Sequence, residues 1–314
     1  MNLVSVVIPS YNHSCYIKQA VESVLGQSYQ NVELIVIDDG STDNSLEYLQ
    51  SVKDERYKLI KQKNTGAHTA INIGLSHAQG DYLAILNSDD VFHPERIAAC
   101  SKQLDDGVDL VATWIEVIDH NGKVLGIKEG WNNMLPWECK QDIRSNNGLD
   151  DFSKNLLMTN FVSTTSNVVF SRRLYEKIGG MRNLRFAHDW DFLLRAARHF
   201  KCELIEVPLL QYRIHQTNTI SSNRAWMLFE ICWIFAVHLQ YFTEKMFPHS
   251  TCSDNISDKI DFLAQSINLQ GNEKVMWMLL QYINEREKLG DTTSAETLIS
   301  DEHLRSEFIR YIVS

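Results

Sequence analysis

The chain has 314 residues, of which 44% are hydrophobic and 22% charged, with 14 glycines and 5 prolines; this composition excludes collagen-like, low-complexity and wholly disordered proteins. Its 30 basic and 40 acidic residues give a formal charge of −10, which argues against nucleic-acid binding because phosphates must be neutralised by Lys and Arg. The six cysteines are far apart and form no Cys-x-x-Cys pair, which indicates reduced thiols rather than a disulfide framework or a zinc site.

Strand and helix signals alternate through the N-terminal part of the chain. Continuous β-branched runs predict buried strands, and apolar residues at helical spacing predict the helices between them. The strands are expected at residues 4–8, 32–37, 57–60 and 82–86, and the helices at 14–26, 42–49 and 70–76. This alternation predicts an α/β fold with a mostly parallel sheet, right-handed crossovers and flanking helices.

The pattern becomes less regular in the middle of the chain and almost entirely helical at its end. We expect helices at 94–104 and 186–200, strands at 110–118, 166–170 and 209–212, a polar turn at 119–122 that leads into a hairpin strand, and a loop over 130–150. The composition shifts near residue 220. We therefore predict a domain over 1–220 and an α-helical C-terminal region over 221–314.

Three of the predicted strands end in polar residues. The segments are Ser10-Tyr11-Asn12, Asp38-Asp39-Gly40-Ser41 and Asn87-Ser88-Asp89-Asp90. Ligands of open parallel sheets bind beyond the carboxyl ends of the strands, where an aromatic ring can stack on a base and carboxylates can hold a divalent cation against phosphate. Taken singly, each segment is also typical of a simple turn or cap.

An ordered set of motifs runs through the first two thirds of the chain. It consists of 4–12 (VSVVIPSYN), 32–43 (VELIVIDDGSTD), 64–66 (NTG), 70–74 (AINIG), 87–90 (NSDD), 166–172 (SNVVFSR), 179–180 (GG), 188–191 (HDWD) and 212–215 (YRIH). With these motifs the chain resembles the family 2 glycosyltransferases, which are inverting enzymes of the GT-A fold. The resemblance covers about residues 2–220 and implies a Rossmann-like domain that binds a nucleotide-sugar.

The resemblance implies a UDP-sugar donor and a divalent cation, Mn²⁺ or Mg²⁺. By position in the motifs, the donor-binding residues are Pro9, Tyr11, Asp39, Asn64, Gly66, Asp89, Asp90 and His215. The resemblance implies that Tyr11 stacks on the base, that Asp39 binds the uracil edge, and that Asp90 and His215 are metal ligands. Arg213 pairs either with a phosphate or with a nearby acid.

Inverting transfer needs a carboxylate that accepts the proton of the attacking hydroxyl. The candidates are Asp189 and Asp191, which lie about 200° apart on a helix and so cannot both face the sugar. The family motif aligns with Asp189 as the catalytic base and leaves Asp191 to face elsewhere, for example toward Arg195. The alternative is that Asp189 is simply a charge favoured at a helix N-terminus.

Three positions depart from the family pattern. Ile71 stands where many relatives carry Arg, His188 replaces the usual acid before the base, and Ser88 leaves two carboxylates in the acidic motif. Each departure can alter the choice of donor. Gly74 is either a close-approach residue of its motif or a helix end.

The predicted activity is transfer of a sugar to a hydroxyl of a lipid-linked oligosaccharide or a growing polysaccharide, in the biosynthesis of a surface polysaccharide such as O-antigen or capsule. The alternatives are a nucleotidyltransferase and a non-catalytic sugar-nucleotide-binding protein. Residues 1–8 lack the features of a secretory signal, and no apolar stretch is long enough to cross a bilayer. We therefore expect a cytoplasmic protein, with the inner face of the membrane as its alternative place of work. The aromatic segment after residue 223 serves either core packing, a homodimer contact or peripheral membrane contact.

Overall fold

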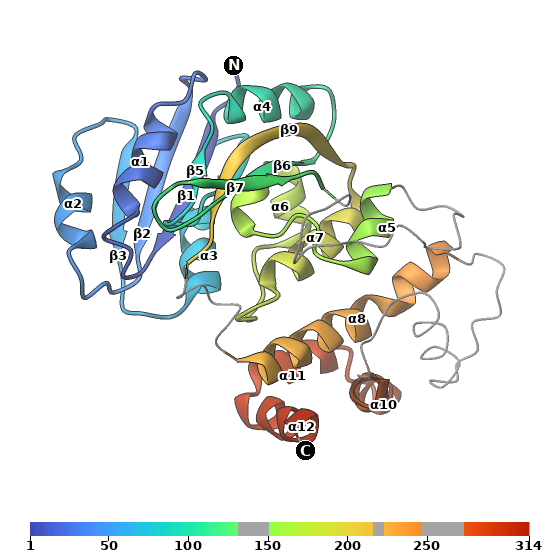
Figure 1. Ribbon diagram of the computed structural model, residues 1–314. Coiled ribbons are helices and arrows are strands. Elements are labelled where there is room, and N and C mark those ends of the chain that lie inside the picture. Colours follow the sequence, from blue (N-terminus) through green and yellow to red (C-terminus); the bar gives the residue numbers. More distant parts are fainter. Residues whose placement is uncertain (131–150, 216–222, 247–272, 314) are drawn as a thin grey trace. The chain divides into compact units, whose positions relative to one another are not determined.

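The computed structural model describes residues 1–130, 151–215, 223–246 and 273–313 (Figure 1). These residues group into two compact units. The first contains residues 1–130, 160–182 and 195–215, and the second contains residues 151–159, 183–194, 223–246 and 273–313. Residues 183–194 therefore precede position 220 and yet group with the C-terminal helices. The loop predicted over 130–150 lies, from residue 131 on, outside the described residues.

The first unit begins with the predicted alternation of strands and helices. Four strands pair in parallel in the order β3-β2-β1-β4. They are β1 (Val4–Ser10), β2 (Val32–Asp38), β3 (Tyr57–Lys61) and β4 (Tyr82–Ile85), and they alternate with α1 (Ile17–Leu25), α2 (Ser45–Ser51) and α3 (Ala67–His77). β1 is buried along its whole length, because β2 and β4 pair with its two edges and the helices α1 and α3 pack on it. The predicted elements of this part are confirmed.

Within the described residues the sheet has nine strands in the order β3-β2-β1-β4-β8-β6-β9-β5, with β7 paired to β6. The further strands are β5 (Val91–Phe92), β6 (Leu110–Ile118), β7 (Val124–Lys128), β8 (Val169–Ser171) and β9 (Cys202–Arg213). β6 and β9 are parallel, whereas β5, β7 and β8 pair antiparallel with their neighbours. The α/β fold with a mostly parallel sheet is thus confirmed.

Two of the predicted strands have different bounds in the structure. The strand expected at 166–170 is a short 3-10 turn, Thr165–Asn167, followed by β8, because the Thr164 hydroxyl accepts a hydrogen bond from the Ser166 amide and closes a turn there. The strand expected at 209–212 is the end of the much longer β9, which pairs with β6 along its length. The helices α4 (Arg96–Asp105) and α6 (Arg172–Ile178) also belong to the first unit.

Two motifs of the sequence meet where α3 packs on the sheet. Gly74 lies inside α3 rather than at its end, and a Cβ atom added there would come within 2.2 Å of Cγ1 of Val7 in β1. Nearby, Asn72 joins α3 to the backbone of Met181. Its side-chain amide donates to the Met181 carbonyl oxygen at 2.7 Å and accepts from the Met181 N–H at 2.7 Å. Gly180 leaves room for this amide, because a Cβ there would be 2.1 Å from Asn72 Oδ1.

The second unit is helical. It contains α5 (Asp151–Met158), the first part of α7 (His188–His199), α8 (Arg224–Met246), α10 (Glu273–Lys288), α11 (Ser294–Ser300) and α12 (Glu302–Val313). α8 packs on α10 and α12, and Phe229, Trp233 and Ile234 are fully buried in this packing. None of the helices in the described part of the chain has both the length and the hydropathy needed to cross a membrane.

Candidate functional site

The loops after β1 and β2 are joined by hydrogen bonds at the carboxyl edge of the sheet. Asn12 adopts a left-handed conformation with φ of 54°. Its amide N–H donates to the Ser41 hydroxyl at 3.1 Å, and its side-chain oxygen accepts from the Thr42 N–H at 2.7 Å. Tyr11, immediately before it, is 45% exposed. The ring predicted to stack on a base is therefore accessible to a ligand.

Asp39 organises the loop that contains two further predicted donor-binding residues. Its carboxylate is buried and accepts hydrogen bonds from the N–H of Thr65 at 2.9 Å, the N–H of Gly66 at 2.9 Å and the side-chain amide of Gln62 at 2.7 Å. Gly66 has a φ of +91°, in the region that favours glycine. The structure thus brings Asp39 and the 62–66 loop, with Asn64 in it, to one edge of the sheet.

The predicted Pro9 lies within β1, buried beside Ile37 of β2. It therefore forms part of the strand that leads to this edge.

A cluster of two imidazoles and one carboxylate lies beyond β1, β4 and β9. One nitrogen of His13, one nitrogen of His215 and one oxygen of Asp89 are all within 4.8 Å of one another. Asp89 Oδ2 is 2.9 Å from His215 Nε2, and His13 Nδ1 is 2.7 Å from the Ser88 hydroxyl. Ligands about 2.1 Å from a metal ion stand ~3 Å apart at neighbouring octahedral positions, so Asp89 and His215 already have suitable spacing.

The surroundings of His13 favour its neutral imidazole. Burial lowers the pKa of His13, although the neighbouring Asp89 carboxylate opposes this effect. A neutral imidazole offers a lone pair to a metal, and a hydrogen bond to its other nitrogen fixes which nitrogen is available. The Ser88 hydroxyl makes that bond to Nδ1 of His13. The ring of Tyr16 stacks on His215 with centroids 5.3 Å apart and holds it in place.

Asp90, the other predicted metal ligand, faces the protein interior. It is buried and accepts hydrogen bonds from the Ser166 hydroxyl at 2.5 Å and the Arg213 N–H at 3.0 Å. Burial, and next the charge of Asp89, raise the pKa of Asp90 well above its usual range. The carboxylate beside His215 therefore belongs to Asp89 and not to Asp90, which differs from the predicted pair. The physical reason is that residues 87–90 form a turn, closed by a hydrogen bond from the Asp90 N–H to the Asn87 carbonyl oxygen at 3.1 Å, while the Arg213 N–H holds the Asp90 carboxylate in the interior.

The side chain of Arg213 contacts the residues that carry the cluster. Its Nε donates to the Asp89 carbonyl oxygen at 2.8 Å, and one terminal nitrogen donates to Gln19 Oε1 at 2.7 Å. The guanidinium carbon also lies 4.8 Å from the centre of the Tyr16 ring. Arg213 is only 2% exposed. These contacts go to carbonyl oxygens and an aromatic face, and the charge of Arg213 also acts to lower the pKa of the Asp90 carboxyl. An acid is therefore near Arg213, and contact with a phosphate stays a prediction.

Sequence reasoning did not select His13, Tyr16 or Ser88 as site residues. The signal was available for His13, because it directly follows the Tyr11-Asn12 segment that was placed at the edge of the sheet. In the acidic motif Ser88 takes the place of a third carboxylate, and in the structure its hydroxyl orients His13.

Asp189, the predicted base, belongs to the second unit. It lies in the first turn of α7, is 8% exposed, and accepts a hydrogen bond from the Trp190 N–H at 2.7 Å. Asp191 Oδ1 is 3.0 Å from Nε2 of His238, a partner that the sequence did not suggest, and both side chains are buried. His188 has a buried Nδ1 with no hydrogen-bond partner among the described residues. The role of Asp189 stays a prediction, since the donor-edge residues belong to the first unit.

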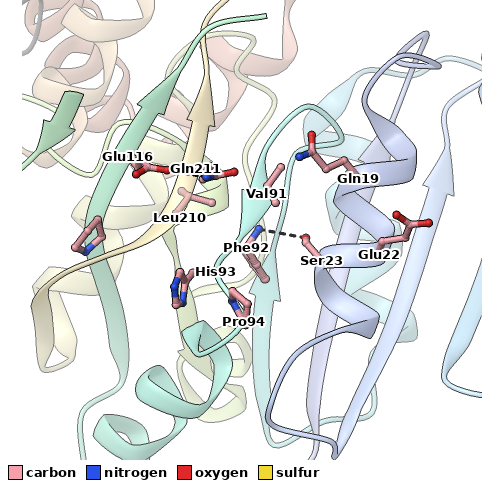
Figure 2. Close-up of a pocket in the computed structure, with 11 residues that line it drawn as sticks. Gln19, Glu22, Ser23, Val91, Phe92, His93, Pro94, Glu116, Leu210 and Gln211 are labelled. Carbon is pink, nitrogen blue, oxygen red and sulfur yellow. Dashed lines mark hydrogen bonds between the residues drawn. The ribbon is translucent and has the colours of Figure 1, made fainter. Parts of the chain in front are cut away.

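A separate cavity of about 350 Å³ opens between α1, β5, β6 and β9 of the first unit (Figure 2). Its described lining includes the carboxylates of Glu22 and Glu116 and contains neither Lys nor Arg. A diphosphate would be repelled by these charges. The cavity therefore does not fit a nucleotide, and the His13–Asp89–His215 cluster is the better candidate for the donor site.

The comparisons with known proteins agree with this fold. A model of the family described as "Glycosyl transferase family 2" matches residues 5–179, which is more than half of the chain. The chain belongs to this family.

Several proteins named as glycosyltransferases are similar to this chain in sequence. An uncharacterized glycosyltransferase of Rickettsia prowazekii is 30% identical over 224 residues, which cover 70% of this chain and 66% of that protein. One from Haemophilus influenzae is 48% identical over 108 residues, 33% of this chain and 42% of that protein. Glycosyltransferase GlyG of Streptococcus pneumoniae is 42% identical over 107 residues, 33% of this chain and 36% of that protein. The chain thus spans less than two thirds of the length of each of these relatives.

Solved structures share the fold at low identity. The crystal structure of S. aureus TarS 1-349 matches 95% of this chain and 90% of that chain with a TM-score of 0.57 and 16% identity. The same fragment of TarS has been solved in complex with UDP-GlcNAc and with UDP. At 16% identity, this similarity shows a shared fold.

Proposed function

We propose that this chain is an inverting glycosyltransferase that transfers one sugar from a UDP-sugar to a hydroxyl group of an acceptor. The observation that carries the proposal is the His13–Asp89–His215 cluster at the same sheet edge as the Asp39-bound loop. Membership of glycosyl transferase family 2 supports this class of reaction. The complexes of TarS with UDP and UDP-GlcNAc support a uridine nucleotide as the donor for the shared fold.

The donor base would bind between Tyr11 and the Asp39-bound loop. The exposed ring of Tyr11 offers a face for stacking on uracil. Asp39 Oδ2 accepts from Gly66 N–H, and because a carboxylate oxygen has two lone pairs it can also accept from a base N–H. Asn64 and Gly66 then bring backbone close to the nucleotide, and Pro9 shapes the floor of its pocket.

Asp89 and His215, with His13 as a third ligand, would hold a divalent cation at the diphosphate. The donor set of one carboxylate and two imidazoles fits Mn²⁺ better than Mg²⁺, because Mg²⁺ prefers an all-oxygen shell. When bound, the cation offsets the negative charge that builds on the departing diphosphate. Asp90 supports this site from the interior through its hydrogen bonds to Ser166 and Arg213.

Asp189 would act as the general base in a single displacement. Its carboxylate accepts the proton of the acceptor hydroxyl while the acceptor oxygen forms a bond to the anomeric carbon. The bond from that carbon to the diphosphate oxygen breaks on the opposite face, and UDP leaves with the electron pair. The configuration at the anomeric carbon is therefore inverted.

The acceptor that we propose is a lipid-linked oligosaccharide or a growing surface polysaccharide, met at the inner face of the cell membrane. This part of the proposal is supported by the family alone. In it, residues 1–220 form the catalytic domain and residues 221–314 contribute to acceptor binding.

The test is a donor screen followed by product analysis. Purified protein is incubated with UDP-sugars and Mn²⁺, and a donor that raises the melting temperature is used for transfer assays, because a ligand of the folded state stabilises it. Release of UDP with transfer to an acceptor supports the proposal, whereas release of pyrophosphate would indicate a nucleotidyltransferase. Asp89→Asn should remove the response to Mn²⁺, and Asp189→Asn should stop transfer while UDP binding persists. Loss of UDP binding in Asp189→Asn would instead assign that residue to the donor site.

A further inference from the structure

A buried carboxylate of α8 holds the segment that leads into α7. Glu230 is 0% exposed. Its Oε1 accepts a hydrogen bond from the Arg185 N–H at 2.8 Å, and its Oε2 accepts from the N–H groups of Phe186 at 2.6 Å and Ala187 at 3.0 Å. The indole N–H of Trp226, one turn earlier on α8, donates to Oε1 at 2.8 Å. Three consecutive backbone N–H groups that converge on one anion form a nest.

The position of Glu230 needs a physical explanation, because α8 is otherwise strongly apolar there. Its neighbours Phe229, Trp233 and Ile234 are fully buried. A carboxylate among such side chains is costly unless hydrogen bonds satisfy it. The N–H groups just before a helix equally lack partners within that helix. Glu230 and the start of α7 satisfy each other, so the carboxylate is an anchor for this segment.

A second polar contact holds the same segment two turns further along α8. Nε2 of His238 lies 3.0 Å from Oδ1 of Asp191, and both side chains are buried. Between the two contacts, the ring of Trp190 packs edge-on against Phe235 of α8, with centroids 5.3 Å apart. α8 therefore contacts the chain on both sides of Asp189 in the sequence (α7 and α8 in Figure 1).

A contact from α12 adds to this arrangement. Arg305 donates to the carbonyl oxygen of Asn183 at 3.3 Å, and its guanidinium carbon lies 4.9 Å from the centre of the Trp226 ring. Trp226 is the same residue whose indole binds Glu230. The anchor is thus part of a connected set of contacts that links the C-terminal helices to residues 183–191.

We propose that Glu230 and His238 are positioning residues for Asp189, and that this is the contribution of α8 to catalysis. The inference rests on the proposed function, in which Asp189 is the base. A general base must reach the hydroxyl within hydrogen-bond distance, and a displacement of about 1 Å can lower the rate by about 100-fold. α8 fixes the backbone before Asp189 through Glu230 and the backbone after it through His238 and Asp191.

The first experiment measures the anchor without any activity. Hydrogen exchange of the wild-type chain should show the amides of residues 185–187 protected, although they precede the helix. In Glu230→Gln, which replaces an acceptor oxygen by an NH₂ group, these amides should exchange at least about 10-fold faster. Exchange in β1 should not change. Fast exchange of the three amides in the wild type, or unchanged exchange in the variant, would overturn the anchor.

The second experiment measures catalysis. In Glu230→Gln and in His238→Asn we expect kcat to fall by about 10- to 100-fold, with the Kd for UDP unchanged. Ile234→Val is the matched control, because it changes a buried residue of the same helix that makes none of these contacts. It should lower the melting temperature and keep kcat. A normal kcat in both test variants, or an equal loss of kcat in the control, would overturn the positioning role.

Asp189→Asn, assayed in parallel, separates the two proposals. If Asp189→Asn is inactive while Glu230→Gln keeps its full kcat, the positioning role alone is refuted. If Asp189→Asn keeps its activity, the assignment of the base fails, and the positioning role fails with it, while the exchange result for the anchor stands by itself.

Discussion

Substitution of Gly74 by Ala tests how α3 is seated on the sheet. In an exposed helix the change would stabilise the protein by about 1 kcal/mol. Here the new Cβ would lie 2.2 Å from Val7 Cγ1, whereas ordinary contacts begin near 3.4 Å. Val7 is fully buried in β1, where its backbone pairs with Ile35 and Ile85 on either side, so it has little freedom to move.

The cost of this overlap should exceed the gain in helix propensity. Overpacking of a core costs typically 1–3 kcal/mol, and an overlap of this size places the cost near ~3 kcal/mol. We expect Gly74→Ala to lose about 2 kcal/mol net, which corresponds to a melting temperature lower by roughly 4–8 °C for a unit of this size. The measurement is thermal unfolding followed by circular dichroism, with Ser76→Ala on the exposed face of α3 as the control.

A double-mutant cycle shows whether the overlap is the cause. Val7→Ala alone should destabilise by leaving a cavity. The double variant should lose clearly less stability than the sum of the two single variants, because the new Cβ at position 74 fills the space that the Val7 side chain leaves. Additive losses, or a Gly74→Ala variant as stable as the wild type, would refute the packing of α3 on β1 as described.

Three further predictions concern the site and its support. Asp39→Ala removes the acceptor of the 62–66 loop amides, and since a hydrogen bond to a charged group contributes ~1.5–3 kcal/mol, we expect the Kd for UDP measured by calorimetry to rise at least about 10-fold; an unchanged Kd would contradict this. Partial burial acts to raise the pKa of Asp43, but hydrogen bonds from two serines lower this pKa to about 2. The ionised Asp43 carboxylate therefore stabilises the fold fully above its unfolded pKa of about 4, and this stabilisation is lost as the pH falls through about 2. Melting curves of Asp43→Asn should therefore show a weaker loss of stability in that acid range than those of the wild type, and identical profiles would disprove the assignment. Asn72→Ala leaves the N–H and carbonyl groups of Met181 without their partner, and should lower the free energy of unfolding in urea by about 1–3 kcal/mol, a change that an unmoved unfolding midpoint would rule out.

The sequence was most informative where burial imposes a simple pattern. β1 and β2 are β-branched runs covered on both faces, so a continuous apolar signal predicts them closely. β5 has only two residues, too few for any periodicity, and it exists because β9 is there to pair with it. Tertiary pairing of this kind leaves almost no local signal.

The same limit applies to the site. The sequence placed Asp89, Asp90 and His215 at one edge, but which of two adjacent carboxylates faces the imidazole depends on the local direction of the backbone. The pairing of Arg213 N–H with Asp90, across 123 residues, decides it. In the sequence Glu230 only interrupts an apolar stretch. Its role could not be predicted, because its partners are backbone N–H groups, which every residue except proline carries.

The place of β9 in the sheet has a consequence for biosynthesis. Among the strands of the described residues β9 is the last to be translated, yet it lies between β6 and β5 rather than at an edge. A nascent chain that has not reached it exposes one side of β6, leaves β5 without its partner, and lacks His215. Open strand edges are templates for wrong pairing, so the chain is vulnerable to mispairing during synthesis until β9 is inserted, and the His13–Asp89–His215 cluster is completed at that same step.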